Sequence, residues 1–308
     1  MPEIRRVSGV SGAARAPGLR SGREGQPDLM SRSVAAICWL RRDLRVRDNR
    51  ALWCALEHAR SRGGKALVVF VFDTDILSAL PDRDDRRVAF IAESLLELDD
   101  RLRQTGAGLL VLHGPARREI PALVERIGGV PVFASHDFEP FGTARDAAVG
   151  QELAKIGGEL VTVKDHVVFE KDEVLSGAGT PFRVFTPYLK AWSTRLERDP
   201  DSELRAWPSE SALELVADPS PWGGLGFGGV EDIGFAIPAG TSAEPGERAG
   251  RARLAEFVQK MPAYAQTRDS PGIDGTSGLS VDLRFGTISV RDAVRAARLI
   301  CRGMFKKV

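Results

Sequence analysis

The stretch that decides the fold reads Val34-Ala35-Ala36-Ile37-Cys38-Trp39-Leu40-Arg41-Arg42-Asp43-Leu44-Arg45-Val46-Arg47-Asp48-Asn49. Its first seven residues are apolar without alternation, which is typical of a strand buried on both faces of a sheet. The turn that follows is charged and lacks glycine, and a helix is expected from about 49 to 60. A buried strand that leads directly into a helix is the building block of a parallel sheet.

The same pattern repeats along the first half of the chain. Further apolar runs rich in Val, Ile and Leu occupy 66–72, 109–113, 130–134 and 160–163. Helical stretches between them are expected at 86–104, 120–127 and 143–156, and in the first of these the apolar residues recur at alternating intervals of three and four. Five strands that alternate with helices predict the α/β class, with a doubly wound parallel sheet.

The chain is expected to contain four segments. Residues 1–32 are rich in Gly, Ser, Arg and Pro and read as a disordered leader, which a translation start at Met30 would largely remove. Residues 33–165 form the α/β domain, and 166–246 form a connector with many prolines and a glycine cluster. Residues 247–308 return to helical periodicity and are interpreted as a partial all-α domain.

Composition limits the class of protein. The 308 residues are 43% hydrophobic and 28% charged, as in a soluble globular chain, and no apolar run approaches the roughly 20 residues that span a bilayer. The three cysteines and four histidines have neither disulfide nor metal-ligand spacing, so no metal is expected and a reducing cytoplasm fits. The net charge of +1 gives no general sign of nucleic-acid binding, but residues 246–308 hold 12 basic and 6 acidic residues, which favours phosphate contacts there.

A loop near the C-terminus has the composition of a phosphate cradle. It reads Asp274-Gly275-Thr276-Ser277-Gly278-Leu279-Ser280-Val281-Asp282-Leu283-Arg284-Phe285-Gly286-Thr287-Ile288-Ser289. Glycine permits close approach, and hydroxyl and backbone N–H groups donate hydrogen bonds without adding charge. The alternative is an ordinary turn with a helix N-cap.

Three separated motifs together resemble the DNA photolyase and cryptochrome family. They are residues 39–49 in the stretch quoted first, Pro181-Phe182-Arg183-Val184-Phe185-Thr186-Pro187-Tyr188-Leu189-Lys190-Ala191-Trp192, and Tyr264-Ala265-Gln266-Thr267-Arg268-Asp269 with the loop that follows it. They occur in the family's order over about 33–292. Three ordered matches are much more specific than one.

The resemblance implies a light-driven lyase that binds FAD and repairs cyclobutane pyrimidine dimers in DNA. The residues that it implies for the cofactor are Tyr264, Thr276, Ser277, Gly278, Leu279 and Ser280, and Arg268 corresponds to an arginine that contacts DNA. Because the cofactor performs the chemistry, no catalytic side chain is expected. A monomer that binds damaged DNA is expected. The sequence leaves open both the presence and the identity of a second, antenna chromophore, of which folate and deazaflavin are the types that the resemblance implies.

The chain also departs from the family pattern, in which longer chains supply the rest of the helical domain. The five tryptophans all precede the helical segment, so no electron-relay tryptophan is assigned, and weak retention of flavin is expected. A frameshift or a truncated gene model would explain this pattern. Two alternatives therefore stay open: a flavin photoreceptor of cryptochrome type, and an inactive fragment.

Three other patterns are interpreted as structural. The match of Gly224–Gly229 to a dinucleotide-binding GxGxxG lacks the required flanking strand and helix. The arginines of 41–47 are expected to form a salt-bridged loop in which Asp48 caps the next helix. The aromatic stripe of the middle motif has helical spacing and is expected to pack in the core; its members are Phe182, Phe185, Tyr188 and Trp192.

Overall fold

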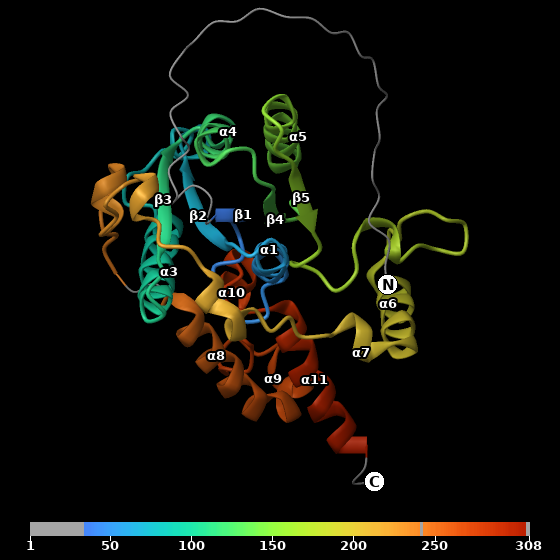
Figure 1. The fold of residues 1–308 in the computed structure, drawn as a ribbon. Coiled ribbons are helices and arrows are strands. Elements are labelled where there is room, and N and C mark those ends of the chain that lie inside the picture. The colour runs from blue at the N-terminus through green and yellow to red at the C-terminus, as the bar shows by residue number, and fades with distance from the viewer. Residues whose placement is uncertain (1–33, 241–242, 306–308) are drawn as a thin grey trace, which may run out of the picture.

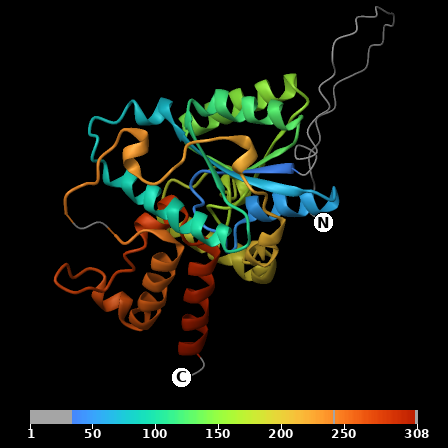
Figure 2. The same cartoon turned by 60° about the vertical axis from the view of Figure 1, so that its left-hand side comes forward.

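The computed structural model describes residues 34–240 and 243–305, with side chains described up to residue 300. The expected disordered leader at 1–32 and the alternative start at Met30 lie outside these residues. The described chain forms a sheet covered by helices on both faces, and a group of further helices lies beyond one end of the sheet (Figures 1 and 2).

The sheet has five parallel strands in the order β3-β2-β1-β4-β5. Their bounds are β1 (Val34–Leu40), β2 (Lys65–Asp73), β3 (Leu109–Gly114), β4 (Val132–Ser135) and β5 (Leu160–Val163). All five predicted strands are confirmed, each with ends within two residues of the prediction. The strand order reverses at β1, so the sheet is doubly wound and the carboxyl ends of β1 and β4 flank the position where such sheets bind ligands.

Two layers of helices sandwich the sheet. One face is covered by α1 (Arg50–Ser61) and α3 (Arg86–Arg103), and the other by α4 (Ala116–Ile127) and α5 (Pro140–Lys155). The short α2 (Thr74–Leu77) follows β2 directly. The buried residues of β1 divide between the two cores, with Cys38 and Leu40 facing α1 and α3, and Ile37 and Trp39 facing α4 and α5. This two-sided burial is the reason that the strand shows no alternation.

The segment after β5 contains one longer helix and several short ones. The elements are η2 (Lys171–Glu173), α6 (Phe185–Arg198), α7 (Pro200–Glu203), η3 (Ser209–Leu215), η4 (Ser220–Trp222) and η5 (Val230–Ile233). Three aromatic residues of the middle motif pack in a small cluster as expected, with Trp192 against Phe169 at 5.6 Å and Phe182 against Tyr188 at 6.1 Å between ring centroids. The prediction was wrong for Phe185, whose side chain is 70% exposed. As the first residue of α6 it lies at the end of the helix, outside the packed cluster.

The glycine cluster lies along the open edge of the sheet. The N–H of Leu225 donates to the carbonyl of Val111 on edge strand β3 at 2.8 Å, and Gly224 has a φ of +115°. A Cβ at Gly224 would lie 2.6 Å from Leu110, so this strap approaches the strand too closely for a side chain. Only the short η5 follows the cluster. The interpretation of the GxGxxG match as structural is confirmed, since the glycines lie along an edge strand of the sheet and cover its exposed edge.

The final helices are α8 (Gly246–Lys260), η6 (Met261–Ala263), α9 (Tyr264–Thr267), α10 (Ser280–Phe285) and α11 (Val290–Phe305). They lie together beyond the carboxyl end of the sheet (Figure 1). The start of α8 is tied to α3, because the N–H groups of Gly246 and Arg248 donate to Ser94 and Glu97 at 3.0 and 2.9 Å. The helices observed at 34–240 and 243–305 include none with the length and apolar character needed to cross a membrane.

Candidate functional site

The charged loop after β1 is organised around two buried polar side chains. Asp43 accepts hydrogen bonds from the N–H of Arg41 at 2.8 Å and from the hydroxyl of Ser135 on β4 at 2.7 Å. Asn49 caps α1 by accepting from the N–H of Leu52 at 2.9 Å. The prediction that Asp48 caps this helix was wrong, because Asn49 occupies the N-cap position and Asp48, with a φ of +49°, turns its carboxylate to another partner.

That partner lies in the last helix. Arg291 donates to the carboxylates of Asp48 at 3.0 Å and Asp165 at 2.8 Å, while Arg45 pairs with Asp165 at 2.6 Å and Arg295 with Asp48 at 2.9 Å. We call these five residues the ion hub. The interpretation of the arginine-rich motif as a salt-bridged loop is therefore confirmed, and the hub also joins the sheet to α11 across more than 240 residues of sequence.

The two acids of the hub have shifted pKa values. Burial alone would raise the pKa of Asp48, but Arg291 and hydrogen bonds from its neighbours lower it overall. Burial likewise opposes ionisation of Asp165, yet Arg45 and Arg291 hold its pKa well below the ordinary range. Both carboxylates are therefore charged at neutral pH.

The loop that resembles a flavin-phosphate site is held from its C-terminal side by the β1 loop. At the end of α10, Gly286 has a φ of +66°, and a Cβ there would lie 2.0 Å from the carbonyl oxygen of Arg42. The N–H of Leu44 donates to the carbonyl of Phe285 at 3.1 Å. The backbone of α10 is therefore docked directly on the backbone of the β1 loop.

The same loop is held from two other directions. Arg253 of α8 pairs with the fully buried Asp282 of α10 at 2.7 Å, and this hydrogen bond raises the pKa of the guanidinium. Gly275 lies so close to Thr267 that a Cβ would meet its hydroxyl at 2.3 Å. The loop is thus packed against α9, which carries Tyr264.

Residues 276–280 present hydrogen-bond donors at the surface. Thr276, Gly278 and Ser280 are exposed, whereas Leu279 is 3% exposed and anchors the loop. Within the described chain, the hydroxyls of Thr276 and Ser280 and the N–H groups of Thr276, Ser277 and Gly278 have no hydrogen-bond acceptor. A cluster of unpaired donors on a supported backbone suits the diphosphate of a dinucleotide, so these residues fit the phosphate part of FAD.

Tyr264 and Arg268 lie on the neighbouring surface. The ring of Tyr264 contacts Phe257 with 5.6 Å between centroids, and the guanidinium of Arg268 lies 5.8 Å from the Tyr264 ring. Arg268 is about half exposed, and its nearest carboxylate is Asp269 at 3.6 Å. The basic residue Lys260 pairs with Glu256 and Asp274. Of these two cations, Arg268 is the freer to meet a phosphate.

A cavity of about 450 Å³ lies across the carboxyl ends of β1 and β2. Its wall includes Trp39, Phe70, Phe72 and Leu77, and α10 closes one side with Phe285. Its polar wall residues are Arg41, Arg42, Asp73, Asp75, Asp137, Glu139, Arg145 and Arg284. A mostly aromatic and aliphatic cavity of this size with charged groups in its wall is typical of a site for a small organic molecule.

The sequence patterns did not predict this cavity, whose wall includes Asp137, Glu139, Phe141 and Gly142. Asp137 and Gly142 lie against each other, since a Cβ on Gly142 would meet the Asp137 carboxylate at 2.3 Å. The sequence feature that could have predicted the cavity is a pair of acids. Asp73 is the last residue of β2, and Asp137 lies two residues after β4. In a parallel sheet such residues meet at the ligand-binding edge.

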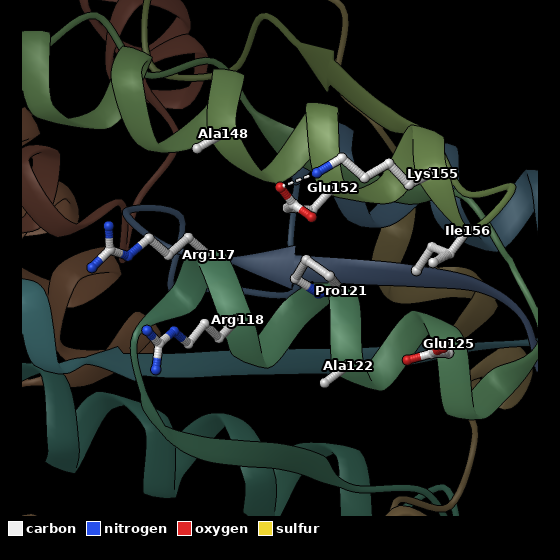
Figure 3. A pocket seen from close by; sticks show the side chains of 9 residues that line it. All are labelled: Arg117, Arg118, Pro121, Ala122, Glu125, Ala148, Glu152, Lys155 and Ile156. Atoms are coloured by element: carbon white, nitrogen blue, oxygen red, sulfur yellow. Dashed lines mark hydrogen bonds and ion pairs between the residues drawn. The ribbon is translucent and has the colours of Figure 1, made fainter.

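A second hollow of about 660 Å³ lies between α4 and α5, on the outside of the sheet (Figure 3). Its lining carries three basic and two acidic side chains, and two of the basic ones are paired, Arg117 with Asp75 at 3.2 Å and Lys155 with Glu152 at 2.7 Å. The small residues Ala122 and Ala148 line it between these charges. The near balance of charge gives this hollow no preference for an anion. Across the described residues, no group of three His, Cys, Asp or Glu side chains is placed to hold a metal.

Comparison with known proteins gives a consistent result. A family model described as DNA photolyase matches residues 36–209. The deoxyribodipyrimidine photo-lyase of a Synechococcus strain is 35% identical over 262 residues, which are 85% of this chain and 53% of that protein. An uncharacterized 31.6 kDa protein of another Synechococcus strain is 31% identical over 256 residues, 83% of this chain and 86% of that protein. The crystal structure of a class III photolyase from Agrobacterium tumefaciens superposes with a TM-score of 0.73 at 26% identity, covering 88% of this chain and 54% of that one.

A parallel sheet with a helical segment docked at its carboxyl edge is the architecture that this chain shares with photolyases and cryptochromes. The chain belongs to the DNA photolyase family. It spans about half the length of the photolyases that it matches.

Proposed function

We propose that this chain is a photolyase-type flavoprotein that takes part in the light-driven repair of cyclobutane pyrimidine dimers in DNA. The observation that carries the proposal is the cluster of unpaired donors at 276–280, on a loop fixed to the sheet by Gly286 and to α8 by Asp282. These residues and Tyr264 are proposed to hold FAD, and Arg268 is proposed to contact DNA. The proposed organisation is an α/β domain at 33–165, a connector at 166–246 and a helical FAD-binding segment from 247.

Each group has a distinct task in this proposal. The chemistry that bound, reduced FAD supplies is light-driven transfer of an electron to the dimer. The loop 276–280 holds the diphosphate and so fixes the cofactor, and Arg268 orients the DNA backbone through a charged hydrogen bond to phosphate. A pyrimidine dimer is poorly stacked, so its extrusion from the duplex costs less than that of an intact base. A monomer acting in the cytoplasm is part of the same proposal.

The proposal is tested first by the absorption spectrum of protein purified in the dark. A flavin band near one per chain, followed by loss of dimers from irradiated DNA under blue light, would support it. If FAD neither copurifies with the whole chain nor binds when added, the loop does not hold the cofactor.

Removing the two free hydroxyls should weaken FAD binding. Each donates to a charged phosphate oxygen in the proposal, so the double variant Thr276→Ala/Ser280→Ala is expected to lose at least about 100-fold in FAD affinity, measured by fluorescence titration. Ser193→Ala on the exposed side of α6 is the control and should leave the affinity unchanged. Equal affinity of the double variant and the control would remove these hydroxyls from the cofactor site.

Replacing Arg268 tests the DNA surface. Arg268→Gln should weaken binding of dimer-containing DNA and lower the slope of log affinity against log salt by about one, because one phosphate contact is lost. Arg248→Gln, which removes an 84% exposed guanidinium on α8, is the control. An unchanged salt slope in Arg268→Gln would contradict a phosphate contact.

The cavity at the carboxyl ends of β1 and β2 is proposed to hold the second chromophore. Its volume and aromatic wall support a flat organic molecule, of which folates and deazaflavins are examples. The absorption spectrum of protein purified in the dark would show which chromophore binds there.

A cryptochrome-type photoreceptor is the second candidate function. It is favoured by a chicken cryptochrome-2 that matches 83% of the chain at 27% identity. A repair protein must distinguish damaged from intact DNA, whereas a signalling protein need not. A preference for dimer-containing over intact duplex therefore separates the two functions.

A further inference from the structure

One acid in the wall of the cavity lacks a complete set of partners. Asp73 is the last residue of β2 and is 6% exposed. Its Oδ1 accepts a hydrogen bond from the N–H of Asp75 at 3.1 Å, and Asp73 thereby caps α2. The same oxygen accepts from the N–H of Ala116, at the start of α4, at 3.3 Å. Its Oδ2 is buried and has no hydrogen-bond partner among the described residues.

The other acids of the wall are paired. Asp75 forms an ion pair with Arg117, Asp137 with Arg145, and Glu139 with Arg42 and Arg284. Within the described part of the chain, Asp73 is therefore the one cavity acid without an ion pair. A buried oxygen with no donor is costly, and such groups in native proteins commonly mark a ligand or a functional role.

The electrostatics of Asp73 agree with this view. Burial raises the pKa of its carboxyl above the ordinary value, while the two N–H donors and the charge of Arg145 act in the opposite direction. Oδ2 of Asp73 therefore remains a hydrogen-bond acceptor for which the described residues provide no donor. A ligand that brought an N–H group to Oδ2 would stabilise the charged form.

A second residue of the cavity wall, Arg42, has a buried donor without an acceptor. The Nε–H of Arg42 is buried without an acceptor, although its terminal nitrogen pairs with Glu139 at 2.9 Å. Among all the cavity's described side chains, Asp73 and Arg42 are the two with a buried unpaired atom. One atom needs a donor and the other an acceptor, and the uncharged residues of the cavity wall are largely aromatic and aliphatic.

We propose that Asp73 determines which ligand this cavity accepts, by taking a hydrogen bond from a ring N–H of a flat aromatic heterocycle. The ligand class is a planar amide- or imide-containing heterocycle, whose ring N–H serves Asp73. The inference rests on the proposed chromophore site, because that site defines the cavity as the place where such a molecule binds.

The test uses a pair of probes and a pair of variants. The probes are lumiflavin, a flat tricyclic imide, and its derivative methylated at the imide nitrogen, which has no N–H there. Asp73→Asn keeps an oxygen for the N–H groups of Asp75 and Ala116 but replaces Oδ2 with an amide donor. Asp75→Asn is the matched control, because it neutralises an acid of the same wall that already has a partner.

The whole chain should bind lumiflavin about 10- to 100-fold more tightly than the methylated probe, the range expected for a hydrogen bond to a charged group. Asp73→Asn should abolish this preference, and Asp75→Asn should keep it. The affinity of the unmodified protein for lumiflavin should also fall as the pH is lowered through the raised pKa of Asp73, since only the ionised carboxylate has the free acceptor. The melting temperature of Asp73→Asn without ligand should equal or exceed that of the unmodified protein, because an unpaired buried charge is removed.

The outcomes separate the inference from the site on which it rests. If both probes bind equally well to the unmodified protein, or if Asp73→Asn keeps the preference for lumiflavin, Asp73 does not select the ligand although the cavity is still a binding site. If neither probe binds, the proposed chromophore site fails and the inference falls with it. Loss of the preference together with a lower melting temperature would show a structural role for Asp73 and would also overturn the inference.

Discussion

Replacing Arg291 with methionine is expected to lower the free energy of unfolding by about 3–5 kcal/mol. The guanidinium is 5% exposed and serves two carboxylates, Asp48 and Asp165, which are 1% and 0% exposed. Its removal leaves Asp48 with Arg295 and Asp165 with Arg45 as their remaining cationic partners. Breaking one side of a buried ion pair costs far more than the pair contributes, since the remaining charges stay desolvated.

Urea denaturation followed by circular dichroism measures the effect, and Arg248→Met supplies the control. Arg248 is 84% exposed and faces Glu244 at 3.9 Å, so its loss should change the free energy of unfolding by no more than about 0.5 kcal/mol. Both substitutions place methionine in a helix, which equalises helix propensity. If the two variants were equally stable, the ion hub would contribute nothing to holding α11 on the sheet.

The pH dependence of the free energy of unfolding tests the ion hub independently. Asp48 and Asp165 have lower pKa values in the folded protein than the ordinary value near 3.9 for an unfolded chain. The folded state therefore binds fewer protons, so the stability that these acids contribute is complete above about pH 5 and is lost as the pH falls below it. In Arg291→Met the two pKa values should be lowered less, and the loss of stability between about pH 5 and pH 2 should be shallower than in the unmodified protein.

The sheet could be predicted from sequence because its pattern is local. Each strand is a short run of apolar residues, and each run places side chains into both helical layers, as Cys38 and Ile37 do in β1. Turn residues and helical periodicity between the runs then leave few topologies, because parallel connections are right-handed and short. No knowledge of distant contacts is needed for that step.

The partners of the charged loop could not be predicted in the same way. Both Asp48 and Asn49 are good N-cap residues, and the choice between them depends on Arg291, which lies 243 residues further along the chain. The position of Phe185 is another case, since helical spacing indicates a stripe but not where the packed cluster ends. The unpaired oxygen of Asp73 is a third, because a sequence shows the acid and not the absence of its donor.

The candidate cofactor loop was placed by resemblance to a family and not by its composition. Thr276, Ser277 and Gly278 would read equally well as a turn with an N-cap. The structure adds the physical reason that the loop can present its donors, since α10 behind it is fixed by Arg253 through Asp282. Whether the loop binds FAD stays a prediction.

The tightest contact behind that loop leads to the second large effect. Gly286→Ala is expected to lower the free energy of unfolding by at least about 3 kcal/mol, with loss of FAD binding. The new Cβ would lie 2.0 Å from the carbonyl oxygen of Arg42 and 2.6 Å from the Cα of Asp43, and both are backbone atoms that no rotamer change can move. To relieve the clash, α10 must separate from the β1 loop and give up the hydrogen bond between Leu44 and Phe285.

Gly278→Ala separates this steric contact from simple backbone strain. Gly278 has a φ of +63°, nearly that of Gly286, but a Cβ there would meet no atom within 4 Å. The penalty for alanine in a left-handed conformation is about 1–2 kcal/mol and should be common to both variants. The excess loss in Gly286→Ala, measured by thermal unfolding of both proteins, therefore reports the contact between α10 and the β1 loop. Equal losses would mean that the two segments are not in contact in solution. The proposed FAD-phosphate loop would then be supported by the Arg253–Asp282 pair and by the packing of Gly275 against Thr267.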